Sequence, residues 1–441
     1  MQHAAAAHGL ATRYEFKTLP RSKHLFRQCM KRGDMGRIAF EFLFDEEPAN
    51  TFNRHLCRTG GRVPSSCRTR GGRKHVITAP TGRLRRGSAA FYRSMSRSFF
   101  LIDARCRMTA KFAAAGSLLS GRVWHNWTFR GEADFTDTHP ALVAAYIRYA
   151  RIRGLGVMFG ESKEPMSLEW QTSARNITFM ERALPTAFVP SHHVGIKVDT
   201  SGSRWSAAAG VFGRDINDTD PNDRGWGVTG RVTYMPLHHH GMSLHLGLSG
   251  AYRETDQKFS QLRFQSRPES HLSEVDFVNS QAIRAVANHQ VLGLEAAGVW
   301  GPASIQSEYI RTFVERTNGR SNLEFDGWYL YGSYFLTGEA RPYYPRRSAF
   351  EAISPRRPFL QQGGYRACEV AIRYRHIDLN DATISGGAQG DVTSALNWYP
   401  RQHLRVMMNY IDVSTDANAA GRRGRGSDNP ALIEFRFQLD F

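Results

Sequence analysis

The sequence predicts an all-β fold, a transmembrane antiparallel β-barrel of about sixteen strands. Three observations predict it: a period of two in hydrophobicity that recurs from residue 126 onward, turn residues between the repeats, and 12% aromatic residues together with 40 glycines. No stretch approaches the roughly 18 consecutive apolar residues that a spanning helix needs. A barrel strand needs only one apolar face, so a low average hydropathy does not argue against membrane residence.

Residues 1–125 differ from the rest of the chain in charge and cysteine content. They hold 24 Lys and Arg against 7 Asp and Glu, about +17, whereas residues 126–441 hold 34 against 33, about +1. Four of the five cysteines also lie there: Cys29, Cys57, Cys67 and Cys106. We therefore expect a basic, irregular segment at 1–125, of doubtful origin, and a barrel domain at 126–441. The chain start lacks the basic and apolar regions of an export signal.

The predicted strands follow one another in segments that alternate between apolar and polar residues. They are 126–136, 142–151, 154–162, 192–199, 204–213, 226–236, 242–252, 259–266, 275–285, 291–300, 303–314, 323–336, 366–378, 388–400, 402–414 and 430–441. Short and long connections alternate between them, as in outer-membrane barrels. Because successive strands run in opposite directions, the connection 337–365 should lie at the end of the barrel that has the short connections. Its length is unexpected there.

The last segment alternates best. Its apolar face holds Ile433, Phe435, Phe437, Leu439 and Phe441, and its polar face holds Glu434, Arg436, Gln438 and Asp440. An aromatic last residue that completes the alternation favours a strand between lipid and water over a strand of a soluble sandwich.

Arginine supplies most of the positive charge in the predicted barrel, 31 of its 34 basic residues. A guanidinium is permanently charged, matches phosphate oxygens and is weakly hydrated, which suits an anion pore. With the apolar faces toward lipid, the candidate pore-lining and anion-binding residues are Arg130, Arg148, Arg231, Arg263, Arg373, Arg375, Arg405 and Arg436. For each of them the alternative is a structural charge, balanced by acids on the same face.

Several segments in the same order resemble the phosphate-selective porin family, the porins O and P. These are 141–190, 293–310, 326–341, 370–387, 394–400, 406–413 and the closing FRFQLDF. The resemblance implies a trimeric barrel in a Gram-negative outer membrane whose basic lumen passes small anions. It also implies that 141–190 includes a constriction loop, in which Lys163, Arg175 and Arg182 are candidates for reaching the pore. Salt bridges within the loop are the alternative for these three residues.

We therefore expect a passive channel for small inorganic anions, phosphate or polyphosphate in particular, with outer-membrane lipid as surroundings and a homotrimer as the assembly. We expect no enzyme activity, cofactor, metal or nucleic-acid partner; His238, His239 and His240 indicate a polar turn, because adjacent residues converge poorly on one ion. Two alternatives stay open. One is a non-conducting or defective porin-derived barrel, and the other is a polyanion or nucleic-acid binder through the basic N-terminal segment.

Overall fold

The computed structural model describes residues 90–103, 108–136, 140–151, 154–218, 225–239, 241–255, 261–267, 276–356, 366–416 and 429–440. Most of the predicted basic segment 1–125, with the alternative of a nucleic-acid-binding role, lies outside the described residues, because residues 1–89 and 104–107 are not among them. So do Cys29, Cys57, Cys67 and Cys106.

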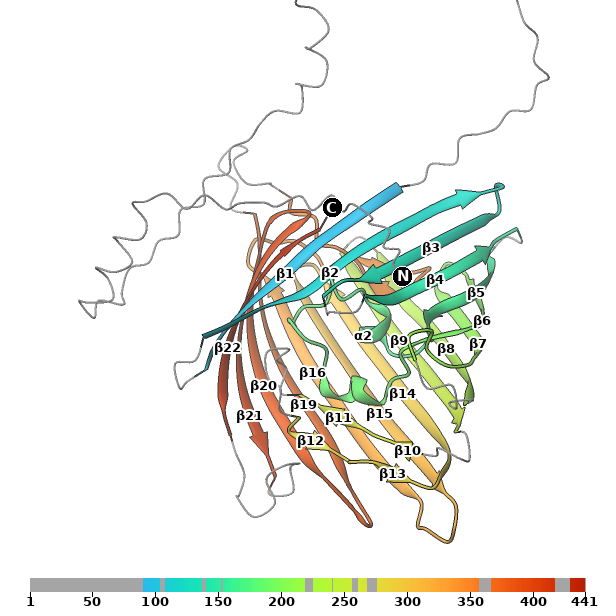
Figure 1. Ribbon diagram of the computed structural model, residues 1–441. Coiled ribbons are helices and arrows are strands. Elements are labelled where there is room, and N and C mark those ends of the chain that lie inside the picture. Colours follow the sequence, from blue (N-terminus) through green and yellow to red (C-terminus); the bar gives the residue numbers. More distant parts are fainter. Residues whose placement is uncertain are drawn as a thin grey trace, which may run out of the picture. The chain divides into compact units, whose positions relative to one another are not determined.

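Sixteen antiparallel strands form a closed barrel, in which each strand pairs with its neighbours in chain order and the last strand pairs with the first (Figure 1). Closure joins Ser98–Asp103 of the first strand to Leu432–Phe437 of the last. The strands are β1 (Ala90–Asp103), β2 (Met108–Val123), β3 (Trp127–Asp134), β4 (Ala141–Tyr149), β5 (Leu155–Lys163), β6 (His192–Ser201), β7 (Trp205–Phe212), β8 (Trp226–His239), β9 (Met242–Glu254), β14 (Val286–Trp300), β15 (Ala303–Arg316), β16 (Leu323–Phe335), β19 (Ala367–Asp381), β20 (Ile384–Arg401), β21 (Leu404–Thr415) and β22 (Ala431–Leu439).

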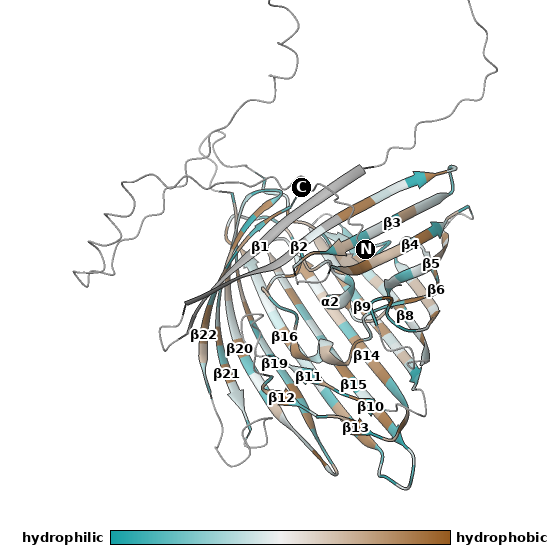
Figure 2. Cartoon of the chain, viewed as in Figure 1, coloured by the Kyte–Doolittle hydropathy of each residue, from teal (hydrophilic) through white to brown (hydrophobic). Residues whose placement is uncertain are grey.

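The barrel wall is apolar outside and polar inside, the reverse of a soluble protein. On β22, Glu434, Arg436 and Gln438 are buried inside, whereas Phe437 is 42% exposed on the outer face. Hydrophobic and hydrophilic residues alternate along the strands in Figure 2. The predicted all-β barrel is confirmed. No helix within the described residues is long and apolar enough to cross a membrane.

The barrel begins earlier than the sequence predicted, because β1 and β2 both lie before residue 126. Two features of these strands explain why an alternation with a period of two is not apparent in their sequence. The pairing of β1 with β2 shifts register around Arg97, so the alternation is interrupted there. The β2 sequence MTAKFAAAGSLLSGRV consists largely of Ala, Gly and Ser, so its two faces differ little in hydropathy.

Two predicted strands, 259–266 and 275–285, are not barrel strands. They lie in the connection between β9 and β14 and form short pairs: β10 (Gln261–Leu262) with β13 (Ile283–Arg284), and β11 (Gln265–Ser266) with β12 (Val278–Asn279). Their apolar residues Phe264, Val278 and Ile283 are buried in a cluster with wall residues such as Phe325. The periodicity of this segment therefore reflects packing inside the barrel and not contact with lipid.

The two ends of the barrel differ in their connections. One end, the turn end, has short connections such as Gly301–Pro302 between β14 and β15 and carries the C-terminal end of β22. The connection between β16 and β19 is also at this end, as parity predicted, but it is long. It contains β17 (Tyr343–Tyr344) and β18 (Ala349–Phe350), which pair with each other. We refer to residues 342–351 as the lumen hairpin.

The connection between β5 and β6, residues 164–191, enters the barrel from the opposite end and is called the lumen loop (Figure 1). It contains the short helix α2 (Leu168–Gln171) and the 3-10 helix η2 (Leu184–Phe188). The helix η2 packs against the inner face of β15, β16 and β19. Inside the barrel Phe188, Phe264 and Phe325 meet edge to face, with centroids 5.1 and 5.9 Å apart. One side of the lumen is therefore filled by apolar packing.

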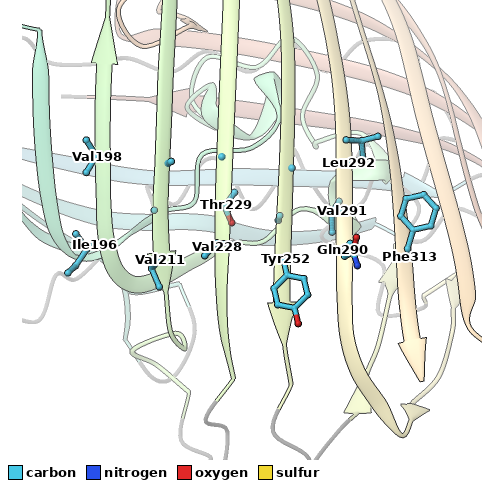
Figure 3. A pocket seen from close by; sticks show the side chains of 15 residues that line it. Ile196, Val198, Val211, Val228, Thr229, Tyr252, Gln290, Val291, Leu292 and Phe313 are labelled. Atoms are coloured by element: carbon cyan, nitrogen blue, oxygen red, sulfur yellow. The ribbon is translucent and has the colours of Figure 1, made fainter. Parts of the chain in front are cut away.

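The outer wall carries a shallow apolar groove across β6–β9, β14 and β15 (Figure 3). Its floor is the hydrogen-bonded row Ala209, Gly230 and Gly250, and bulky residues such as Val228 and Leu292 form its rims. All of these face away from the lumen, so the groove belongs to the lipid-facing surface and not to the pore.

Candidate functional site

The start of the lumen loop is fixed to the wall by Glu164. This buried carboxylate accepts hydrogen bonds from Thr229 and Arg253, and its Oε1 lies 2.7 Å from Nδ1 of His193. Burial alone would raise the pKa of Glu164, but the hydrogen bond from His193 and the charge of Arg253 lower it below its ordinary value. The loop therefore leaves β5 at a carboxylate that stays charged at neutral pH.

The helix α2 is held by a carboxylate on the other side of the barrel. Glu308 on β15 accepts hydrogen bonds from the main-chain N of Leu168 at 3.0 Å and of Glu169 at 2.8 Å. The Ser167 hydroxyl accepts from N of Trp170 at 3.1 Å. The first amides of a helix lack partners within the helix, so these acceptors fix both the position and the direction of α2 in the lumen.

Four predicted pore-lining arginines lie on β19, β21 and β22 and point inward, but the lumen loop covers them. Arg373 donates to Oε1 of Glu169 at 3.1 Å and to the main-chain O of Glu181 at 2.9 Å. Arg436 donates to Oε1 of Glu181 at 2.7 Å. The side chains of Arg373 and Arg436 are 0% and 1% exposed.

The other two covered arginines also contact the loop. Arg375 pairs with Asp391 of the neighbouring strand and lies 3.4 Å from O of Arg182. Arg405 donates to O of Ile177 and of Thr178, at 2.7 Å each. The inner face of β14–β22, which we call the covered wall, thus presents its guanidinium groups to the loop.

Arg231 on β8 faces the lumen hairpin. It donates to both carboxylate oxygens of Glu295 at 2.7 to 3.2 Å, and to O of Ser348 at 3.0 Å. Nearby, His245 lies 3.1 Å from Glu295 and 2.6 Å from the hydroxyl of Tyr343. This network attaches the hairpin to the wall near the turn end.

Arg130 on β3 and Arg148 on β4 are more accessible. Their side chains are 38% and 31% exposed, and each pairs at 2.5 Å with a carboxylate of the barrel, Glu132 and Asp199 respectively. We call the inner face of β3–β6 the open wall. Arg263 is not on a barrel strand, contrary to the prediction; it is exposed between β10 and β11, because 259–266 folds as part of the inserted connection.

The three predicted constriction residues all belong to the lumen loop or its start. Arg182 donates to O of Glu169 and to O of Thr172, and its Cζ lies 4.8 Å from the ring centre of Trp170. Lys163 donates to O of Trp170 at 2.6 Å, and its Nζ lies 5.3 Å from the ring centre. Two basic side chains thus lie within contact of one indole ring, whose face attracts positive charge.

Arg175 lies at the far turn of the loop. Its guanidinium is 3.6 Å from Glu132 and 3.8 Å from Asp440, and its main-chain O accepts from Gln438. Since Gln438 and Asp440 lie at the C-terminal end of β22, the loop reaches toward the turn end. One carboxylate, Glu132, therefore faces both Arg130 and Arg175.

The lumen loop and the lumen hairpin meet inside the barrel. The main-chain N of Phe350 donates to Oγ1 of Thr172 at 3.3 Å, and Arg341 donates to O of Asn176 at 3.0 Å. Arg341 also stacks on the Phe350 ring, 4.5 Å from its centre. Segments that enter from opposite ends are thereby joined.

Several residues of the candidate site were not predicted from the sequence. Lys197 on β6 donates to O of Lys163 at 2.7 Å and so extends the cationic group around the loop. It stands between Ile196 and Val198, so the alternation could have placed it inside. No pattern indicated Trp170 or Arg341, because their roles depend on how the loops fold.

Among the described residues, no group of three or more His, Cys, Asp or Glu could hold a metal ion. His238 and His239 are exposed at the end of β8. The lumen instead combines accessible cations, a positioned loop and an apolar packed side.

A family model described as phosphate-selective porin O and P matches residues 113–441. An uncharacterized protein of Caulobacter vibrioides is 31% identical over 321 residues, which cover 70% of this chain and 64% of the relative. Porin O of Pseudomonas aeruginosa is 24% identical over 354 residues, which cover 72% of this chain and 80% of the relative. The chain thus spans 64% of the length of the Caulobacter relative.

Two solved structures share the fold. The anion-selective porin from Comamonas acidovorans matches with 13% identity and a TM-score of 0.51, over 80% of this chain and all of that one. In-vitro folded OmpT, an outer-membrane protein of Vibrio cholerae, matches with 11% identity and a TM-score of 0.51, over 82% of this chain and all of that one.

Proposed function

Because the chain belongs to the family of phosphate-selective porins O and P, we propose that it forms a passive, water-filled channel for small anions in the outer membrane. The observation that carries the proposal is the cationic group beside the lumen loop. Lys163 and Arg182 both contact the Trp170 ring, and Lys197 donates a hydrogen bond to the main chain of Lys163.

The open wall supplies the second side of the proposed path. Arg130 and Arg148 are partly exposed, and Glu132 is shared between Arg130 and Arg175. Asp440 also lies 3.8 Å from Arg175, so the two arginines are balanced in number by two carboxylates, and the proposal depends on the partial exposure of the arginines. A channel conducts when its sites attract an ion enough to admit it and weakly enough to release it, and partly paired arginines meet both needs.

Phosphate is the anion that we propose first. Its oxygens match the planar fork of arginine and accept several charge-assisted hydrogen bonds. We also propose a homotrimer surrounded by outer-membrane lipid, on the basis of family membership and the apolar outer wall. No catalytic role is proposed, since the lumen residues bond to loops and to one another.

A second candidate function is a barrel that does not conduct. The observation in its favour is that three inserted segments occupy the lumen, and that two of them are bonded together through Thr172 and Phe350. In that case the cationic group would stabilise the plug without meeting an ion.

The test is the zero-current potential of the full chain, refolded in detergent and inserted into a planar bilayer under a KCl gradient, followed by titration with phosphate. Anion selectivity with block by phosphate supports the proposal. Cation selectivity overturns the anion assignment, and anion selectivity without block restricts it to small anions in general. The absence of channels from a folded barrel supports the second candidate.

A further inference from the structure

Three hydrogen bonds from the barrel wall hold the lumen loop at Ile177 and Thr178, far along the loop from its attachment at Glu164. Arg405 donates one hydrogen bond to each of these main-chain carbonyls, at 2.7 Å. Asn397 on β20 donates to the Thr178 carbonyl as well, at 2.9 Å. The next residue, Phe179, lies under the guanidinium of Arg373, 4.2 Å from its Cζ.

The partners of Arg405 are unusual for a buried arginine. The residue is 4% exposed, its Cζ lies 4.9 Å from the Tyr399 ring centre, and both of its hydrogen bonds go to main-chain carbonyls. A carbonyl fixes the direction of a guanidinium but does not cancel its charge. The geometry of this side chain therefore serves to hold the loop.

We infer that Arg405 and Asn397 are positioning residues of the channel, which hold the lumen loop so that Lys163, Trp170 and Arg182 stay in the path of the ion. The inference rests on the proposed anion channel for its effect on selectivity. Arg405 acts through the loop and makes no contact with the passing anion.

A fork with two donors explains why arginine occupies this position. Its two terminal nitrogens reach two consecutive carbonyls at once, whereas the ammonium of lysine acts as a single point. Lysine keeps the positive charge but lacks the fork, which would matter for carbonyls and for phosphate alike. Hydrogen exchange of the loop in the lysine variant therefore separates the two roles, since an arginine that only contacted the anion would leave the loop unchanged.

The experiment compares Arg405→Lys, Arg405→Gln and Asn397→Ala with the native full chain. We expect Arg405→Lys to weaken block by phosphate and the preference for anions about fivefold, and to increase the open-channel current noise, because one hydrogen bond of the fork is lost. Arg405→Gln should have at least as large an effect. Asn397→Ala should change both quantities in the same direction, although it removes no charge.

The matched control is Arg311→Lys, since Arg311 is exposed and pairs with Glu324 away from the loop. This variant should retain the native selectivity and noise. Heat-dependent migration of each refolded barrel on a gel confirms that the variants fold.

Hydrogen exchange of the peptide that spans residues 173–183 provides a readout that does not need conduction. Faster exchange in Arg405→Lys and Asn397→Ala supports positioning even if the native chain proves not to be anion-selective, an outcome that would overturn the proposed function alone. The inference would be overturned if Arg405→Lys kept both the native exchange rate and the native selectivity while Arg405→Gln lost selectivity. That result would show that Arg405 acts on the anion through its charge and does not hold the loop.

Discussion

The covered wall and the open wall place arginines at equivalent inward positions but in different surroundings. On the covered wall the side chains of Arg373 and Arg436 are 0% and 1% exposed and are bonded to the lumen loop. On the open wall those of Arg130 and Arg148 are 38% and 31% exposed and pair with carboxylates of the barrel. Alternation along a strand determines which way an arginine points. The inserted loop determines whether its charge is available to an ion.

The largest expected difference between the walls is in stability. Arg373→Met leaves the Glu169 carboxylate buried without its guanidinium, and we expect a loss of about 3 to 5 kcal/mol in the free energy of unfolding. Arg130→Met removes a partly exposed pair and should cost less than about 1 kcal/mol. Denaturation of the refolded barrel in urea, followed by tryptophan fluorescence, measures both values. Equal losses of unfolding free energy in the two variants would mean that the contact with the lumen loop does not make the arginine of the covered wall more important for stability.

The next difference is in selectivity. Arg182→Gln removes one of the two cations on Trp170, and we expect the anion over cation permeability ratio to fall about fivefold, because one charge near the path contributes about 1 kcal/mol. The zero-current potential under a KCl gradient measures the ratio. Arg311→Gln serves as the control, because Arg311 pairs with Glu324 at an exposed position away from the loop. A similar fall of the permeability ratio in the control would mean that the effect comes from the overall charge of the protein and not from the position of Arg182.

Most of the barrel could be predicted from the sequence, because contact with lipid on one face imposes a period of two. The prediction was wrong where something other than lipid covers a strand. At 259–266 and 275–285, Phe264, Val278 and Ile283 pack inside the lumen, so their spacing resembled that of a wall strand. In β1 the shift of register at Arg97 interrupts the pattern.

The site could be predicted less well. Alternation correctly directed Arg373 and Arg405 inward, but their contacts with the loop depend on where residues 177–181 settle, which no local pattern encodes. The unexpected length of 337–365 was the one sign that a segment enters from the turn end. Its bond to the lumen loop through Phe350 depends on tertiary packing alone.

The smallest expected effect concerns acid and the start of the lumen loop. The pKa of Glu164 is lowered in the folded barrel, so its contribution to stability is complete above the ordinary carboxyl pKa and is lost as the pH falls through the lowered value. We expect the open-channel noise to stay constant from neutral pH down through the ordinary range of carboxyl groups, and to rise only below that range, where the lowered pKa of Glu164 is passed. Glu164→Gln should show raised noise already at pH 7 and no further rise in acid. The effect is small because Glu308 and Arg405 still hold the loop at other points. If the noise of Glu164→Gln rose in acid as it does in the native chain, another carboxylate would be responsible for the acid response. Glu164 would then be only a buried partner of Arg253.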